Sequence, residues 1–211
     1  MPRLSHRRGK EGAGPARGRV VHFASGETLF DAGHPPRRLY LLRAGGVRLS
    51  ADNAAIYDLL APGSVFGEKS LLRSPRQRET AKALTSVDVA PFGRSELLAS
   101  VEQDPGFALK LLKALALRME GYQETIRDFV TARAESRLAR LLSRLAPSHP
   151  ALGWVRLRYS PTNPELARMI GTTRWRVSHF MSKFQRLGWL RRNKGIWVLR
   201  EGLGEYLKRA A

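Results

Sequence analysis

Arginine, serine, histidine and tryptophan side chains gather at helical spacing between Ser160 and Leu190, in the run SPTNPELARMIGTTRWRVSHFMSKFQRLGWL. Thr162 is a good N-cap for a first helix, and the glutamate three residues later can complete a capping box. Gly171 ends that helix, and either of the two threonines that follow it can cap a second one. The run therefore predicts two short helices joined by a tight turn.

The second predicted helix has two faces of opposite character. Its apolar stripe is formed by Val177, Phe180, Met181, Phe184 and Leu187. Its other face carries Arg174, Trp175, Ser178, His179, Ser182, Lys183 and Arg186. A helix with an apolar back and a basic, hydrogen-bonding front suits the major groove of DNA. The motif alone also fits many ordinary two-helix corners, so it does not by itself establish DNA binding.

Positive charge is concentrated in the same part of the chain. The protein has 211 residues and a formal net charge of +19. Residues 133–211 carry 17 Lys or Arg against 4 Asp or Glu, whereas residues 20–105 carry 10 of each. A basic module joined to a neutral one is the electrostatic pattern of a phosphate-binding domain beside a domain of another kind. The charge therefore favours a nucleic acid as the partner.

Downstream of the two helices, alternating residues predict a β-hairpin. Its strands run over 189–192 and 196–199, with Gly195 in the turn between them. A strand over 154–159 should precede the helices, and a short helix over about 204–209 should close the chain. The hairpin corresponds to the wing of a winged helix-turn-helix, and its basic tip is placed for phosphate contacts. The predicted DNA-contacting residues are Thr162, Asn163, Thr173, Arg174, Trp175, Arg176, Ser178, His179, Lys183, Arg191, Arg192 and Lys194.

The neutral part of the chain, from Val20 to Val89, consists of short β-prone runs. Turn residues break these runs at Ser25-Gly26, Ala32-Gly33, Gly45-Gly46 and Pro62-Gly63. Evenly spaced short strands separated by such turns predict a β-sandwich or jelly roll.

Three groups of residues carry a resemblance to a known family. They are the strand Leu39-Tyr40-Leu41-Leu42 with Gly45 and Val47, the run Pro62-Gly63-Ser64-Val65-Phe66-Gly67-Glu68, and the helix-turn-helix with its wing. In order and spacing, the chain resembles the CRP/FNR family of transcription regulators. The resemblance implies an α+β protein with an N-terminal cyclic-nucleotide-binding-like β jelly roll, a long dimerisation helix and a C-terminal winged helix-turn-helix. We place these segments at 20–105, 106–132 and 133–211, after a basic disordered tail at 1–19.

The resemblance also implies a position for an effector pocket. In ligand-binding members a glutamate after the Phe-Gly pair takes the ribose hydroxyl, and an arginine further along pairs with the cyclic phosphate. Glu68 matches the glutamate, and either Arg76 or Arg78 matches the arginine. The candidate set is completed by Thr80, Tyr122 and Gln123, the last two in place of a polar pair that contacts the base.

The candidate pocket departs from the ligand-binding pattern at several places, which include Gln77 after Arg76 and Lys69 where the family usually has an apolar residue. The acidic Glu79 follows Arg78 and would repel a phosphate, and Tyr122 and Gln123 are larger than the residues they replace. We therefore predict a transcription regulator that is not controlled by cyclic AMP. The alternatives are a regulator that depends on another small-molecule effector, and a non-specific nucleic-acid-binding protein.

A seven-residue repeat runs through the segment that joins the two domains. Apolar residues recur at alternating steps of four and three at Ala108, Leu112, Leu115, Met119, Tyr122, Ile126 and Phe129. This is the a/d seam of a left-handed coiled coil, and the resemblance implies dimerisation through the same element. We therefore expect a homodimer whose interface contains all of these residues except Ala108.

The resemblance further implies roles at the start of the second helix. Thr173 and Arg174 match the phosphate-contacting and guanine-reading positions of the family. Trp175 and His179 stand where the family commonly has a glutamate and an arginine. Because a tryptophan cannot accept a hydrogen bond, the half-site should keep one guanine but otherwise differ from the family's usual sequence.

The composition argues against several other classes of function. The chain has no cysteine, so disulfides and cysteine-ligated zinc or iron–sulfur sites are excluded. The 5 histidines show no metal-ligand spacing, and the sequence has no nucleophile-elbow or phosphate-loop motif. We therefore expect no enzymatic activity, catalytic residue, metal or cofactor.

The expected partners are double-stranded DNA, a second copy of the chain and RNA polymerase, the last through the loop 148–153. A small-molecule effector is left open. No apolar run approaches the roughly 18 residues of a membrane span, and the basic first 19 residues lack the apolar region of a secretory signal. The sequence therefore predicts a cytoplasmic protein without a membrane partner.

Overall fold

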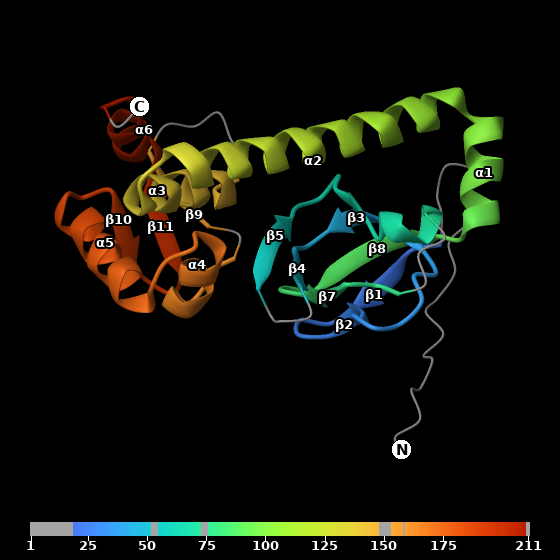
Figure 1. The fold of residues 1–211 in the computed structure, drawn as a ribbon, viewed down its shortest axis with the longest axis horizontal. Helices are drawn as coiled ribbons and strands as arrows, with labels where there is room; N and C mark the ends of the chain where they lie inside the picture. Colours follow the sequence, from blue (N-terminus) through green and yellow to red (C-terminus); the bar gives the residue numbers. More distant parts are fainter. Residues whose placement is uncertain (1–18, 52–54, 73–75, 148–152, 158, 210–211) are drawn as a thin grey trace, which may run out of the picture. The chain divides into compact units, whose positions relative to one another are not determined.

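A computed structural model describes residues 19–51, 55–72, 76–147, 153–157 and 159–209 (Figure 1). The chain divides into two compact units, one made of residues up to 52 and from 60 to 118, the other of residues 53–59 and 119–211. All of the predicted tail except Arg19 lies outside the described residues, as do residues 148–152 of the loop expected to contact RNA polymerase.

The N-terminal strands form two four-stranded sheets. The first has the order β1-β8-β3-β6 and consists of Val21–Phe23, Val87–Phe92, Leu39–Ala44 and Val65–Phe66. The second has the order β2-β7-β4-β5 and consists of Thr28–Phe30, Glu79–Ala83, Val47–Ala51 and Ile56–Leu60. The strand pairs β3–β8 and β4–β7 are antiparallel, with Leu41 opposite Ala90 and Leu49 opposite Ala81. The predicted β jelly roll is confirmed.

The jelly roll has an apolar core because alternate residues of each strand point to the same side. Leu42 and Phe66 of the first sheet pack with Val47 and Ala81 of the second, and all four are fully buried. The turn between β3 and β4 requires glycine: Gly45 has φ 82°, and a Cβ there would collide with the carbonyl oxygen of Ser86.

Two helices follow β8: the short α1 (Arg94–Gln103) and the 27-residue α2 (Pro105–Thr131). The structure divides the predicted seam between two faces of α2. Leu115 packs against the apolar cluster on the outer face of the first sheet. Leu112, Met119 and Ile126 are 63%, 62% and 64% exposed, respectively. The helix therefore carries two apolar stripes, of which only one is open to a partner.

The C-terminal part of the chain is a winged helix-turn-helix, as predicted. Its helices are α3 (Ala134–Leu145), α4 (Asn163–Met169), α5 (Arg174–Arg186) and α6 (Arg200–Arg209). Its three-stranded sheet has the order β10-β11-β9, formed by Leu190–Arg192, Ile196–Leu199 and Trp154–Arg156. Both strand pairs are antiparallel.

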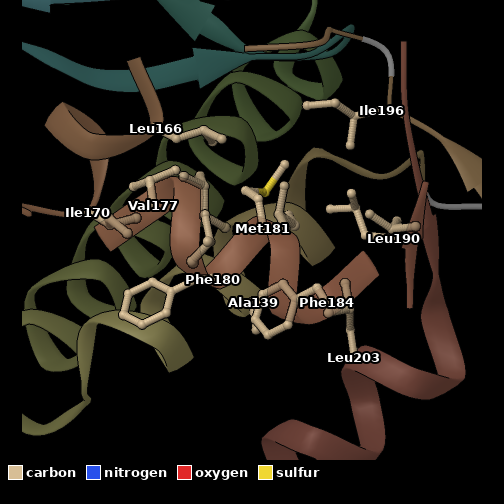
Figure 2. Close-up of a cluster of buried hydrophobic side chains, with 14 of the residues drawn as sticks. Ala139, Leu166, Ile170, Val177, Phe180, Met181, Phe184, Leu190, Ile196 and Leu203 are labelled. Atoms are coloured by element: carbon tan, nitrogen blue, oxygen red, sulfur yellow. The ribbon is translucent and has the colours of Figure 1, made fainter. Parts of the chain in front are cut away.

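The second helix of the motif, α5, runs through the middle of this domain's core (Figure 2). Val177 and Phe184 are fully buried and Met181 is 2% exposed, as the helical spacing predicted. Around them lie side chains from the first helix, the wing and the last helix: Leu166, Ile170, Leu190, Ile196 and Leu203. The core therefore fixes the orientation of α5 from several sides.

Three expectations about this domain are wrong in detail. Leu187 is 47% exposed, because α5 ends at Arg186 and Gly188, at φ 72°, turns the chain away. The last helix begins at Arg200 and contains Gly202, where a Cβ would collide with the ring of Trp189. That glycine makes room for an aromatic ring and does not interrupt the helix. The strand expected over 154–159 ends at Arg156.

Candidate DNA-binding site

Both helices of the motif begin at capped N-termini. The Thr162 hydroxyl accepts a hydrogen bond from the backbone N–H of Glu165 at 3.4 Å, and the Glu165 carboxylate accepts one from the Thr162 backbone N–H at 2.8 Å. This confirms the predicted capping box. Thr173 is the N-cap of α5, because its hydroxyl accepts a hydrogen bond from the backbone N–H of Arg176 at 3.3 Å. The sequence left Thr172 and Thr173 as alternatives, and the structure selects Thr173.

The turn between α4 and α5 is held from behind by the end of α2. Gly171 has φ 61°, and a Cβ there would lie 2.6 Å from the Phe129 ring. The Arg137 guanidinium lies 5.0 Å from the centre of the same ring and donates a hydrogen bond to the carbonyl oxygen of Ile170 at 3.0 Å. Phe129, expected at a dimer interface, therefore supports the turn of its own helix-turn-helix.

The exposed face of α5 presents an arginine followed by a stacked aromatic pair. Arg174 and Arg176 are exposed, and Trp175 is 75% exposed. The Trp175 ring stacks on His179 one turn later, with ring centres 5.9 Å apart and an angle of 17° between the planes. These side chains stand on the first two turns of the helix, which are the turns that reach base edges in the major groove.

Asn163 connects three elements that carry predicted DNA contacts. Its amide nitrogen donates a hydrogen bond to the Ser178 hydroxyl at 2.7 Å, and its amide oxygen accepts one from the Arg192 guanidinium at 2.6 Å. These bonds join α4 to α5 and to the first strand of the wing. The structure therefore brings together three predicted residues that are distant in the sequence. A network of this kind limits the movement of the side chains before DNA arrives.

Two other predicted DNA contacts have partners within their own domain. The Lys183 ammonium lies 2.8 Å from a carboxylate oxygen of Glu135 in α3. Arg191 lies on the opposite side of β10 from Arg192, with its guanidinium 3.9 Å from the centre of the Trp154 ring. Strand alternation explains this separation, because Leu190 and Arg192 share one side of β10 and Arg191 takes the other.

The tip of the wing is a tight turn with unusual backbone angles. Lys194 and Gly195 have φ 45° and 139°, and the Lys194 carbonyl accepts a hydrogen bond from the Arg156 guanidinium at 2.6 Å. The Lys194 side chain is exposed. A compact basic turn can contact a phosphate without reading the base sequence.

The candidate effector residues do not converge. On β7, Ala81 and Ala83 point into the jelly-roll core, so Glu79 points inward and Thr80 points outward. Glu79 is 4% exposed, whereas Arg76 and Arg78 are exposed. The resemblance placed a phosphate-binding arginine here, and the structure instead turns a carboxylate inward. The Thr80 hydroxyl accepts a hydrogen bond from the backbone N–H of Ala32 at 3.1 Å.

The carboxylates of Glu68 and Glu79 already have cationic neighbours. Glu68, in the short 3₁₀ helix η1 (Glu68–Leu71), lies 3.0 Å from the Arg118 guanidinium, which also donates to the Val65 carbonyl at 2.9 Å. The Lys69 ammonium lies 3.9 Å from the Glu79 carboxylate. The face of α2 that carries Leu111 and Leu115 also carries Arg118, so helical spacing could have identified this residue.

The remaining candidates, Tyr122 and Gln123, belong to the second unit. The Tyr122 hydroxyl donates a hydrogen bond to the Asp58 carboxylate at 2.8 Å, and Gln123 is exposed.

Inside the jelly roll, burial raises the pKa of the Tyr40 hydroxyl above its ordinary value of 10.0, while nearby Arg38 acts in the opposite direction. Within the described ranges, no group of three or more histidine or acidic side chains could hold a metal ion.

Two polar contacts that the sequence did not predict join α2 to α3. Asp128 of α2 is buried and pairs with Arg140 of α3, and Arg144 donates a hydrogen bond to the Thr125 hydroxyl at 2.7 Å. These pairs join two helices that are separated by a break at Ala132 and Arg133. The sequence carries no signal for them, because their partners depend on the angle between the helices.

Among the described residues, none of the helices is long and apolar enough to cross a membrane.

Known proteins match both halves of the chain. Residues 20–104 match the cyclic nucleotide-binding domain, and residues 136–204 match the Crp-like helix-turn-helix domain. The transcriptional regulator SdrP of Thermus thermophilus is 30% identical over 185 residues, which cover 83% of this chain and 87% of the relative. A CRP-like cAMP-activated global transcriptional regulator of Mycobacterium tuberculosis is 26% identical over 177 residues, which cover 81% and 79% of the two chains.

The crystal structure of a CRP/FNR-family transcriptional regulator from Thermus thermophilus aligns with a TM-score of 0.74 at 28% identity, covering 91% of this chain and 100% of that one. A jelly roll joined by a long helix to a winged helix-turn-helix defines a DNA-binding transcription regulator. The matches to both domains agree with that class. The chain belongs to the CRP/FNR family.

Proposed function

We propose that this regulator acts in the cytoplasm as a homodimer on a two-fold-symmetric DNA site, in a sequence-specific manner and without control by cyclic AMP. The observation that carries sequence-specific binding is the arrangement at the start of α5. Thr173 caps the helix, Arg174 and Trp175 project from its first turn, and Asn163 fixes Ser178 and Arg192 beside them. Arg174 can offer a bidentate pair of donors to guanine O6 and N7.

The exposed stripe of α2 supports a homodimer. Beyond Leu112, Met119 and Ile126, the same line of alternating steps of three and four continues through Leu109, which is 69% exposed, and Val130, which is 80% exposed. Apolar side chains at this spacing are stabilised by packing against a second helix of the same kind. A two-fold axis along α2 would present two copies of α5 about 34 Å apart, one turn of duplex DNA.

The interior of the jelly roll supports independence from cyclic AMP. A cyclic phosphate would have to approach the buried Glu79, and like charges repel strongly where water is excluded. Glu68, which would take the ribose hydroxyl, already lies 3.0 Å from the Arg118 guanidinium. With Arg78 exposed, the candidate phosphate partner points to solvent.

Calorimetry tests the proposed independence from cyclic AMP. Titration of the protein with cyclic AMP and with cyclic GMP should give no saturable heat up to about millimolar nucleotide, the range of very weak binding. The same preparation should bind its DNA site, which shows that the protein is folded. Saturable heat at micromolar nucleotide would contradict independence from cyclic nucleotides and would leave the DNA-binding role standing.

A cavity in the first unit favours a second candidate function. Its volume is about 460 Å³, within the range of small-molecule sites, and its apolar walls include Leu39, Leu41, Val65, Phe92, Phe107 and Leu111. Arg43 and Lys110 also line it. A regulator that depends on a small-molecule effector other than cyclic AMP would fit this cavity.

Selection from a randomised duplex pool distinguishes these functions. We expect purified protein, without added ligand and at near-physiological salt, to enrich a two-fold-symmetric site with one guanine in each half. The centres of the two halves should lie one helical turn apart. Salt-sensitive binding to all sequences without enrichment would contradict the proposal. It would point to a missing effector or to a non-specific binder.

The substitution Arg174→Ala should remove one base preference. Binding to the selected site should weaken by about 1–3 kcal/mol, because the guanine loses a bidentate donor pair, and discrimination at that position should disappear. The matched control is Lys194→Ala, which removes a charge at the wing tip. This control should weaken binding to all sequences alike and reduce the dependence of affinity on salt. Unchanged discrimination in Arg174→Ala would mean that α5 does not lie in the groove as proposed.

A further inference from the structure

We infer that Trp175 and His179 form an aromatic ledge that reads the C5-methyl group of a pyrimidine beside the guanine contacted by Arg174. The half-site should therefore contain a thymine at that position, and 5-methylcytosine should be accepted better than cytosine. This inference rests on the proposed sequence-specific binding and names the base that the site selects.

The exposure of Trp175 is the first observation. At 75% exposed, it lies among charged and polar residues on the outer face of α5, whereas Phe184 on the inner face is fully buried. The folded domain therefore does not use the indole for its core. Burying a large apolar ring is favourable, and on this outer face of α5 only a binding partner can bury it.

Neighbouring rings limit the positions that the indole can take. His179 stacks on one face of the indole at 5.9 Å, and the His179 ring meets Phe180 edge to face at 6.0 Å. Phe180 is only 9% exposed and packs in the domain core, so the stack rests on a rigid base. Because Trp175 remains 75% exposed beside the nearly parallel His179 ring, most of the indole surface is directed outward. His179 is thus a positioning residue for Trp175.

The chemistry of the indole limits what it can distinguish in the major groove. It has one N–H donor and no acceptor, so it cannot accept a hydrogen bond from the amine of cytosine or adenine. Its donor can be satisfied by N7 of either purine, which does not distinguish them. The remaining difference between base pairs that an apolar ring can detect is the methyl group of thymine. Trp175 follows Arg174 directly, so the methyl group should lie next to the guanine in the same half-site.

Removal of single methyl groups from the DNA tests whether the aromatic ledge reads thymine. The selected site is synthesised with uracil in place of each thymine in turn, which removes only the methyl group. We expect uracil at one position in each half to weaken binding by about fourfold, the value for one methyl-sized apolar group. In Trp175→Ala, the thymine and uracil duplexes should bind alike. A C·G pair at this position should bind more tightly when its cytosine carries a 5-methyl group.

Two further variants separate the ledge from a general loss of folding. Arg174→Ala should bind more weakly overall but keep the same thymine-to-uracil ratio. His179→Ala should lower that ratio, because the indole loses the ring that holds its position. Equal binding of thymine and uracil duplexes by the unmodified protein would overturn the inference, as would an unchanged ratio in Trp175→Ala.

The proposed function and the ledge fail in different ways. If a symmetric site is enriched but no thymine methyl matters, the regulator stands and the ledge is wrong. If no site is enriched, sequence-specific binding without an effector is wrong. The same comparison is then made between randomised pools that contain thymine or uracil, and equal affinity for the two pools overturns the ledge as well.

Discussion

Replacing Met119 and Ile126 together by glutamate is expected to make the protein monomeric and to lower its affinity for a two-fold-symmetric site by about 10²–10⁴-fold, the advantage that linking two binding modules provides. Both side chains lie on the exposed stripe of α2, at 62% and 64% exposed, and neither belongs to an apolar core cluster. In a dimer, two copies would place four carboxylates in one apolar seam, where charge is costly.

Sedimentation equilibrium and DNA titration measure the two effects, and circular dichroism verifies that the helices remain. The matched control is Leu117→Glu, which changes a leucine that is 58% exposed on the same helix but off the stripe. This control should remain dimeric. A double variant that stays dimeric at micromolar concentration would show that the stripe is not the interface.

Phe184→Ala should lower the free energy of unfolding of the DNA-binding domain by about 3–5 kcal/mol, the usual cost of emptying an aromatic site in a core. Phe184 is fully buried, with the Trp189 and Tyr206 rings at 6.0 and 5.8 Å, so the surrounding side chains have little room to fill the space. Specific DNA binding should be lost at the same time, because α5 would no longer have a fixed orientation.

Urea unfolding followed by tryptophan fluorescence isolates this effect. All 4 tryptophans, Trp154, Trp175, Trp189 and Trp197, lie in the DNA-binding domain, so fluorescence follows the unfolding of that domain alone. The control is Leu187→Ala, a residue that is 47% exposed at the end of the same helix. Its cost should stay below about 1 kcal/mol, as expected for a surface substitution. Equal costs for the two variants would contradict the core described for this domain.

Local signals explain why much of the DNA-binding domain could be predicted. The caps at Thr162 and Thr173, the turn at Gly171 and the wing turn depend on a few neighbouring residues, and the structure contains all of them. Leu187 was placed wrongly because the apolar period extends one residue past the point where the helix ends. The contact between Phe129 and Gly171 could not be predicted, because it depends on how two distant segments pack.

Neither the orientation of the candidate effector residues nor the division of the seam on α2 could be predicted from the sequence. The resemblance implied a phosphate-binding arginine at Arg76 or Arg78, but whether Arg78 or Glu79 points inward depends on where β7 begins. A shift of one residue exchanges inside and outside. The predicted seam on α2 combined residues from two faces of the helix, because both faces carry apolar residues that fit the same seven-residue repeat. Only the packing of Leu115 against its own unit separates the two stripes.

The inward-facing Glu79 also constrains how this protein can evolve. Replacing it alone with a small neutral residue would leave the Lys69 ammonium without the carboxylate 3.9 Å away, and uncompensated charge in a partly buried place is destabilising. Glu68 would still face Arg118, and Arg78 would still point to solvent. Under the proposed independence from cyclic AMP, a response to cyclic nucleotides would therefore require coordinated changes at these positions and not the replacement of Glu79 alone.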